Sequence, residues 1–489
     1  MLLIKVNKNS PTPVFQQIYL QIKSLIETGV LKVGDKLPSS RLLSEKLKVN
    51  RTTVYRAYEE LWSFGYIESR PGSYSFVRQR AQLAIETKIA EEDQINWAQR
   101  ANPNITSLLA SCDHFNNSNT KPGIINFLPL SPDPSQMPAE TFRKYLNKAT
   151  LLHGVDLLSY NNVKGYDPLR AFIKERMAFH GIRTTLDNIL ITNGTQNSLE
   201  LFLKYVAVAG LKIIVEAPTY SAVIPLFEMY GAILLEVPIT KKGIDLKILE
   251  HLLKNNEVAF LFTMPNFQNP TGITSTQAHR EKLLELCKTY NTPIIEDGFE
   301  EEMKYFGKSV MPVKSMDNSG LVIYLGTFSK TLFPGLRLGW MVGNTDLINS
   351  LIQIKQITEI SSNFLIQAAV YEFCQTGNYE LHVKRLHRIY RKRMNTALKA
   401  AEKYLPKDKC FFTKPSGGYT FWINLANNRN NENETVKQFE KNGVAVTPGK
   451  LFYVKQKKEA SFRLSIAHLS ENQIEEGLRK IGIIIEKLN

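Results

Sequence analysis

Residues 321–340 read LVIYLGTFSKTLFPGLRLGW and contain the strongest chemical signal in the sequence. An apolar, β-branched run at 321–327 leads into a turn that contains Thr327, Ser329 and Lys330, and Arg337 follows seven residues after the lysine. A short apolar run bounded by turn residues is typical of a buried strand. Because a lysine after a strand is usually a surface residue, the importance of Lys330 depends on which other polar groups reach the same place.

Further apolar runs lie upstream and alternate with helical patterns. They read NILIT (188–192), LKIIVEAP (211–218), AILLEVPI (232–239), VAFLFTMP (258–265) and TPIIEDG (292–298). Strands that alternate with helices predict an α/β unit with a mostly parallel sheet that is buried on both faces. After Pro334 the pattern changes to a long helical region and then to GGYTFWINL (417–425). This change predicts a smaller α+β subdomain at about 347–489.

Polar residues follow three of these predicted strands. Asn269 comes after the run at 258–265, Asp297 ends the run at 292–298, and Lys330 follows the run at 321–327. In doubly wound sheets, ligands bind at the carboxyl ends of the strands, so the three side chains can converge there. Taken singly, Asp297 could cap a helix and Asn269 could be a turn residue. Taken together, they predict a ligand site.

The residue types match the requirements of pyridoxal 5′-phosphate. An amine forms the Schiff base, a carboxylate keeps the pyridine nitrogen protonated, and a donor faces the ring oxygen. Lys330, Asp297 and Asn269 supply these groups in turn. The phosphate needs helix-start amides, hydroxyls and a guanidinium, for which we expect Gly194, Thr195, Gln196, Thr327, Ser329 and Arg337. Tyr220 in EAPTY (216–220) would lie against the ring face, although a tyrosine there could also be a core residue.

The first 80 residues are basic and helical. They hold 13 Lys or Arg against 6 Asp or Glu, a surplus of 7 within a net charge of +15. Helical patterns at 13–29, 39–48 and 50–65, with Asn50 as an N-cap, have helix-turn-helix spacing. In the third pattern, an apolar stripe contains Val54, Ala57, Tyr58 and Leu61, which leaves Arg51, Thr52, Thr53, Tyr55 and Arg56 exposed for DNA. The alternative is a small helical bundle with a solvated basic face.

The rest of the chain gives fewer signals. Residues 81–122 carry polar runs such as NPNITS and predict a linker between a domain at 1–80 and one at 123–489. The cysteines, which are Cys112, Cys287, Cys374 and Cys410, are scattered, so we expect reduced thiols and no metal site. There is no signal-peptide pattern or membrane-spanning run, so we expect a cytoplasmic protein.

The string VGDKLPSSRLLSEKLKVNRTTVYRAYEELWSFGYIESRPG (33–72) closely resembles the winged-helix domain of the GntR family of bacterial repressors. The resemblance implies DNA contacts by Arg41, Arg51, Thr52 and Thr53, and by Gly72 in the wing; we expect Arg56 to join them. The family's wing reads Gly-x-Gly-x-Phe, and Tyr74 stands here in place of the second glycine.

From about residue 124 onward, the chain resembles the fold type I aminotransferases of the aspartate aminotransferase superfamily. The resemblance implies that Arg463 in SFRLSIAH (461–468) grips a substrate carboxylate. It also implies that Tyr160, which opens YNNVKGYDPLR (160–170), reaches the cofactor phosphate of a neighbouring subunit in a homodimer. Related proteins often carry Asp-x-Tyr, whose phenol bonds to the ring oxygen, whereas this sequence has Asp297 and Phe299.

A winged helix joined to such a domain is the architecture of the MocR subfamily of transcription regulators. The resemblance implies a homodimer that binds operator DNA, pyridoxal phosphate and a small amino compound. A working aminotransferase that acts on a 2-amino acid is the alternative. Whether the dimer is domain-swapped or side by side stays open.

Overall fold

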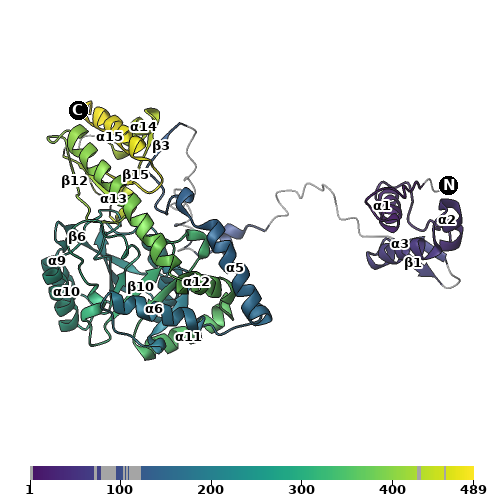
Figure 1. Cartoon of the computed structure of the whole chain (residues 1–489), viewed down its shortest axis with the longest axis horizontal. Coiled ribbons are helices and arrows are strands. Elements are labelled where there is room, and N and C mark those ends of the chain that lie inside the picture. The colour runs from purple at the N-terminus through teal and green to yellow at the C-terminus, as the bar shows by residue number, and fades with distance from the viewer. Residues whose placement is uncertain are drawn as a thin grey trace. The chain divides into compact units, whose positions relative to one another are not determined.

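The computed structural model describes residues 4–70, 74–78, 95–102, 105, 108, 123–426, 431–455, 457 and 459–488. The chain divides into two compact units, residues 1–97 and 98–489 (Figure 1). Most of the predicted linker, together with Gly72 of the predicted wing, lies outside the described residues.

The amino-terminal unit packs helices against a β-hairpin. Helices α1 (Val14–Glu27), α2 (Ser40–Leu47) and α3 (Arg51–Ser63) precede the antiparallel strands β1 (Ile67–Arg70) and β2 (Tyr74–Val77). The predicted stripe on α3 is confirmed, because Val54, Ala57, Tyr58 and Leu61 are all buried in one core with Ile18 and Ile22 of α1. The Asn50 side chain accepts a hydrogen bond from the Thr52 amide and so caps α3, as predicted.

Eight described strands of the second unit form one sheet, in the order β4-β11-β10-β9-β8-β5-β6-β7. They are β4 (Ile189–Thr192), β5 (Lys212–Ala217), β6 (Ile233–Thr240), β7 (Gly243–Ile244), β8 (Phe260–Thr263), β9 (Ile294–Asp297), β10 (Val322–Thr327) and β11 (Gly339–Val342). Strands β6, β5, β8, β9 and β10 pair in parallel, and β11 runs antiparallel to both β10 and β4. The predicted, mostly parallel sheet is confirmed.

Helices cover both faces of this sheet. They are α5 (Ala139–His153), α6 (Asp167–Phe179), α7 (Thr195–Val206), α8 (Val223–Met229), α9 (Leu246–Asn255), α10 (Gln277–Thr289), α11 (Thr345–Glu359) and α12 (Phe364–Gln375). Alternate residues of β4 enter different cores: Ile189 and Ile191 pack in the core that includes α6 and α12, whereas Leu190 packs in the core that includes α7. This alternation follows from the two-residue period of a strand.

The carboxyl-terminal part forms a second sheet, with the described strands in the order β12-β13-β16-β15. Its elements are β12 (Cys410–Phe412), β13 (Thr420–Leu425), β15 (Thr447–Pro448), β16 (Ser461–Ser465), α13 (Asn378–Tyr404), α14 (Glu432–Lys441) and α15 (Glu471–Glu486). Strand β14 (Val444–Ala445) pairs in parallel with β3 (Ile125–Asn126), so the first residues of the second unit also belong to this subdomain.

The sequence predicted that the smaller subdomain begins at about residue 347, but α11 and α12, which follow that residue, pack against the large sheet instead. Helix α12 packs on α5 and α6, and α11 packs on α7, so both helices cover the large sheet. The change of core occurs within α13, where Tyr379 packs with the large sheet while Leu386 and Tyr390 pack in the subdomain core. Helical periodicity reports that a face is buried but not which core buries it.

Two further observations concern the described chain. No helix in it combines the length and the apolar character that a bilayer span requires. Cys287, Cys374 and Cys410 are buried free thiols, and burial raises the pKa of the Cys287 thiol to about 12. Cys112 lies outside the described residues.

Candidate functional site

A cavity of about 150 Å³, large enough for a small molecule, opens at the carboxyl ends of β4, β5, β8, β9 and β10. Its lining consists of Leu130, Gly194, Thr195, Gln196, Tyr220, Met264, Asn269, Asp297, Phe299, Thr327, Ser329, Lys330, Pro334 and Arg337. Ten residues predicted from separate sequence motifs are among them. The parallel strands explain the convergence, because each strand delivers its last residues to the same edge of the sheet.

Asp297 is a buried carboxylate at the end of β9 whose Oδ1 has no hydrogen-bond partner in the described chain. Burial raises the pKa of Asp297 to about 7, and the nearby Lys330 ammonium opposes this rise. Leaving a buried polar oxygen unpaired costs free energy. Because Asp297 lines the cavity, a ligand with an N–H group can supply the missing partner.

Lys330 follows β10 and Asp297 ends β9, but both residues line the same cavity. Its Nζ donates a hydrogen bond to the Leu130 carbonyl, and its own carbonyl accepts one from the Tyr419 hydroxyl at 2.7 Å. Burial lowers the pKa of Lys330, while the neighbouring Glu300 carboxylate acts in the opposite direction. A lowered pKa favours the neutral amine, which is the nucleophilic form.

Asn269 is held by Arg463, which reaches it from β16 of the subdomain. Arg463 Nη1 donates to Asn269 Oδ1 at 3.5 Å, and Nη2 donates to the Leu128 carbonyl at 2.9 Å and to Thr447 Oγ1 at 3.1 Å. An arginine can only donate, so the amide oxygen must face it. The Asn269 Nδ2 hydrogens therefore remain available to a ligand. Arg463 itself does not line the cavity, and burial lowers its pKa to about 10.

The loop that carries Asn269 is fixed by a buried carboxylate on β5. Glu216 accepts hydrogen bonds from the Met264 amide at 2.9 Å and from Gln268 Nε2 at 2.9 Å. Gln268 in turn accepts bonds from the amide and the hydroxyl of Thr271, at 3.0 and 2.6 Å. These bonds hold the residues on both sides of Asn269, so the amide enters the cavity from a rigid loop.

The turn between β4 and α7 forms an anion cradle. Gly194 has φ +95°, and a Cβ there would lie 3.1 Å from Arg337 Nη2. That nitrogen donates to the Asn193 carbonyl at 3.0 Å, which brings the guanidinium to the start of α7. Free amides at a helix start together with an arginine bind phosphate well. Thr195 and Gln196, in the first turn of α7, complete this side of the cavity.

Phe299 lines the cavity near Asp297, so no hydroxyl enters the cavity from that position. Tyr305 does not replace the missing phenol, because its ring is buried in the subdomain core against His387, 5.3 Å between centroids. In the part of the chain that the structure describes, Tyr220 is the tyrosine that lines the cavity. Burial raises the pKa of Tyr220 to about 12, so its phenol stays protonated.

Glu300 is a site residue that sequence reasoning missed. It is buried, its Oε2 accepts a hydrogen bond from the Tyr419 amide at 3.1 Å, and its Oε1 lacks any described partner. Burial raises the pKa of Glu300 to about 8, and Lys330 opposes the rise. The only sequence signal is the run Glu300–Glu302, and acidic runs are normally solvated.

Tyr160 does not line the cavity of its own chain and is 87% exposed. The exposed apolar side chains of Leu151, Val155 and Leu158 precede it in the chain. Contiguous exposed apolar residues mark an interaction surface. This arrangement is compatible with a tyrosine that serves another subunit.

The predicted DNA surface of the first unit joins the starts of α2 and α3. Arg41, Arg51 and Thr52 are exposed, and Arg51 Nε donates to Ser40 Oγ at 3.4 Å across the two helix starts. Two adjacent helix amino termini with exposed arginines favour phosphate contacts.

The remaining predicted DNA residues are held differently. Thr53 is half-buried, and the Arg56 guanidinium lies 3.9 Å from the centroid of the Phe15 ring. The Lys36 ammonium lies 3.0 Å from the ring centroid of Tyr74, the residue that replaces the wing glycine. The wing therefore presents a lysine on an aromatic ring at this position.

Comparisons with known proteins match both units. The model for aminotransferase class I and II matches residues 132–481, and the model for bacterial regulatory proteins of the gntR family matches residues 15–77. The uncharacterized HTH-type transcriptional regulator YdfD of Bacillus subtilis (strain 168) is 29% identical over 98% of this chain and 98% of its own. The probable rhizopine catabolism regulatory protein MocR of Rhizobium meliloti is 28% identical over 82% of this chain and 80% of its own.

A solved structure resembles the second unit. The α-aminoadipate aminotransferase LysN of Thermus thermophilus, complexed with N-(5′-phosphopyridoxyl)-L-leucine, superposes with a TM-score of 0.73 at 30% identity. The match covers 80% of this chain and 98% of LysN.

Proposed function

The chain belongs to the class I and II aminotransferase family and, with its gntR domain, to the MocR subfamily of regulators, and from this premise we propose that it is a transcription regulator that senses pyridoxal phosphate, an amino compound or both. The observation that carries the proposal is the unpaired Asp297 oxygen beside Lys330, in a chain that also presents a basic helix start at Arg51.

The residues of the cavity fit the cofactor. When bound, pyridoxal phosphate supplies an aldehyde and an electron-withdrawing ring. Lys330 would hold it covalently through Nζ, and Asp297 Oδ1 would accept a hydrogen bond from the protonated ring nitrogen. Asn269 Nδ2 would donate to the ring oxygen, because Arg463 already occupies Oδ1. The buried carboxylate would gain the partner that it otherwise lacks.

The phosphate would bind in the cradle at the start of α7. The first amides of α7, at Thr195 and Gln196, would donate to it, and Arg337 would neutralise part of its charge. Thr327 and Ser329 also line the cavity, and their hydroxyls would be further phosphate ligands.

An amino compound with a carboxylate would be recognised by Arg463. Arg463 lies behind the lining residue Asn269, and its buried Nε, which has no partner among the described residues, would be the donor to that carboxylate. The ligand's amine would displace Lys330 from the cofactor, and the released Lys330 amine would take up the proton that the ligand's ammonium group gives up. Ligand binding would then depend on the nearby carboxylates of Glu300 and Asp297, because both favour the protonated form of Lys330.

The homodimer is also a proposal. The exposed apolar residues Leu151, Val155 and Leu158, together with Tyr160, support a surface that a second copy covers. In such a dimer Tyr160 would reach the partner's phosphate. A dimer also suits operator recognition, because its two DNA-binding domains would bind the two half-sites of an operator.

DNA binding with and without the cofactor tests the main proposal. A preferred duplex is selected from a random library by the full chain, and its affinity is then measured with and without pyridoxal phosphate, next to a scrambled duplex. We expect specific binding that the cofactor, or the cofactor with an amino acid, changes several-fold. Equal affinity for both duplexes would contradict a regulator.

The second candidate is a working aminotransferase. The 30% identity to LysN and the complete set of Lys330, Asp297, Asn269 and Arg463 favour it. A panel of 2-amino acids with a keto-acid acceptor, assayed beside Lys330→Ala, tests this function. Turnover that Lys330→Ala abolishes would establish catalysis, whereas cofactor binding without turnover would leave sensing alone.

A further inference from the structure

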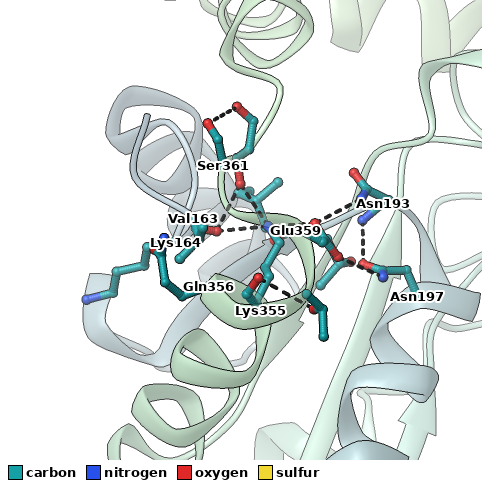
Figure 2. A network of polar contacts seen from close by, with 12 residues as sticks. Val163, Lys164, Asn193, Asn197, Lys355, Gln356, Glu359 and Ser361 are labelled. Carbon is teal, nitrogen blue, oxygen red and sulfur yellow. Dashed lines mark hydrogen bonds and ion pairs between the residues drawn. The ribbon is translucent and has the colours of Figure 1, made fainter. Parts of the chain in front are cut away.

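An ion pair on α11, with a buried lysine and a half-buried glutamate, lies outside the lining of the cavity. Lys355 is 1% exposed, and its Nζ donates to the Val163 carbonyl at 2.8 Å, the Ile191 carbonyl at 2.9 Å and Ser362 Oγ at 2.8 Å (Figure 2). All three donors of the ammonium are therefore used. Glu359, one turn later, lies 3.7 Å from the same nitrogen. Burial lowers the pKa of Lys355 to about 8, and Glu359 opposes that change.

Glu359 extends from this lysine to the phosphate cradle. Its Oε2 accepts a hydrogen bond from Asn193 Nδ2 at 3.1 Å, and its Oε1 accepts one from Asn197 Nδ2 at 3.0 Å. Asn197 Oδ1 also accepts a hydrogen bond from the Asn193 amide at 3.0 Å. One carboxylate thus holds residues on both sides of Gly194, as Figure 2 shows. Because Arg337 bonds to the Asn193 carbonyl, the guanidinium of the cradle depends on the same contacts.

The other end of the network holds the segment that follows Tyr160. Ser362 Oγ donates to the Val163 carbonyl at 2.9 Å, the acceptor that Lys355 also uses. Ser361 Oγ accepts a hydrogen bond from the Asn161 amide at 2.8 Å and donates to the Asn161 carbonyl at 3.2 Å. The backbone directly after Tyr160 is therefore fixed to the end of α11.

We propose that Lys355 and Glu359 are a positioning pair that sets two things at once: the phosphate cradle of this chain and the segment that presents Tyr160 to a second copy. The inference rests on the proposed pyridoxal phosphate site and homodimer, and deepens them. Both halves of a shared phosphate site are set by one ion pair. A change in one half is therefore transmitted to the other.

A purely structural role is the competing explanation. A buried pair that only stabilised the fold would affect every ligand of the cavity alike. A pair that positions the cradle must affect a ligand with a phosphate and spare one without it. Pyridoxal 5′-phosphate and pyridoxal differ by this group alone, so the ratio of their affinities separates the two explanations.

The experiment titrates the full chain with both compounds and measures dimer dissociation of the cofactor-free protein by analytical ultracentrifugation. Glu359→Gln removes the charge, and Asn197→Ala cuts only the cradle end. The matched control is Glu476→Gln, which breaks the Glu476–Arg479 pair (2.8 Å) on α15. Thermal melts confirm that each variant is folded.

We expect Glu359→Gln to weaken pyridoxal phosphate binding by about tenfold, as for the loss of a charged hydrogen bond, to leave pyridoxal unchanged and to raise the dimer dissociation constant. Asn197→Ala should weaken only pyridoxal phosphate, and Glu476→Gln should change nothing. If Glu359→Gln is unfolded, Asn197→Ala still tests the cradle end. Equal losses for both compounds, or no loss, would overturn the proposal. Failure of the native chain to bind either compound would instead refute the proposed function.

Discussion

The DNA surface and the cofactor cavity hold their functional side chains in opposite ways. Arg41 and Arg51 are exposed and make single side-chain bonds, to Glu45 and Ser40. Asp297 and Lys330 are surrounded by the chain, and burial shifts the pKa of each toward its neutral form. Residues of the exposed DNA surface can therefore be substituted at little cost in folding stability. The polar residues of the cavity, by contrast, lower the stability of the fold because they are buried.

Water explains this difference. An exposed guanidinium is solvated until a phosphate replaces that water, so the folded protein bears no desolvation penalty. A buried carboxylate oxygen without a partner, such as Asp297 Oδ1, bears a desolvation penalty in the cofactor-free protein. Substitutions in the DNA surface should therefore weaken binding without changing stability, whereas Asp297→Asn in the cavity should weaken binding and raise stability.

The largest effect is expected for Lys330→Ala. Without the amine no covalent bond to the cofactor can form, so the adduct that borohydride traps should disappear completely. Lys204→Ala, on the exposed side of α7, is the control and should label normally. A labelled Lys330→Ala would move the site to another lysine.

Mixed dimers test whether the buried site is shared. Tyr160→Phe and Lys330→Ala chains, which are each defective alone, should regain one native site when they are combined. The reason is that each mixed dimer holds one cavity with an intact lysine and an intact partner tyrosine. Cofactor retention after gel filtration measures the outcome. If mixing restores nothing, Tyr160 does not serve the partner's site.

Asp297→Asn should raise the stability of the cofactor-free protein while it weakens cofactor binding. A pKa of about 7 in the folded state lies above the usual value of 3.8, so the carboxyl stabilises the fold below about pH 4 and loses this contribution as the pH rises through 7. The gain in unfolding free energy should therefore grow by up to about 2 to 3 kcal/mol between pH 5 and pH 8.

Asp317, at the opposite end of β10, is the matched control. Burial alone would raise the pKa of Asp317. The hydrogen bond from the Val322 amide and the nearby Lys314 ammonium outweigh burial and lower this pKa to about 2. Its charge stabilises the fold above about pH 4, so Asp317→Asn should destabilise the protein equally at pH 5 and pH 8. Denaturant melts at both pH values measure the two variants. If the stability of both variants changed with pH in the same way, the proposal that buried Asp297 destabilises the fold would be contradicted.

Arg51→Ala should cost function alone. Specific DNA affinity should fall by roughly 1 to 3 kcal/mol if Arg51 contacts a base, or the salt slope should fall by about one if it contacts a phosphate. The melting temperature should stay the same, because the side chain is exposed. Arg479→Ala, an exposed arginine paired with Glu476, is the control. An unchanged affinity and slope would remove Arg51 from the interface.

The smallest effect is expected for Phe299→Tyr. A phenol at this wall of the cavity would donate to the ring oxygen of the bound cofactor and make its Lys330 linkage easier to deprotonate. One hydrogen bond of roughly 0.5 to 1.5 kcal/mol corresponds to a pKa of the linkage that is lower by about 0.4 to 1. A spectroscopic pH titration of both proteins measures it. Coincident curves would show that another group already donates.

The sequence by itself determined the elements and the residues at their ends. The run 321–327 and the turn with Lys330 are neighbours along the chain, so their association is visible without a structure. The α3 stripe and the Asn50 cap are equally local, and both were found where predicted. The carboxyl ends of parallel strands lie at one edge of a sheet, which is why Asp297 and Lys330 could be expected to lie close together.

Only the tertiary structure decided which side chains meet across long separations. Arg463 orients the Asn269 amide, the Leu130 carbonyl accepts from Lys330, and Glu300 is buried although its neighbours are acidic. The Lys355 network is of the same kind. Such contacts join residues that are far apart in the chain, and no local pattern encodes them, because burial and partner are properties of the packed core rather than of the segment.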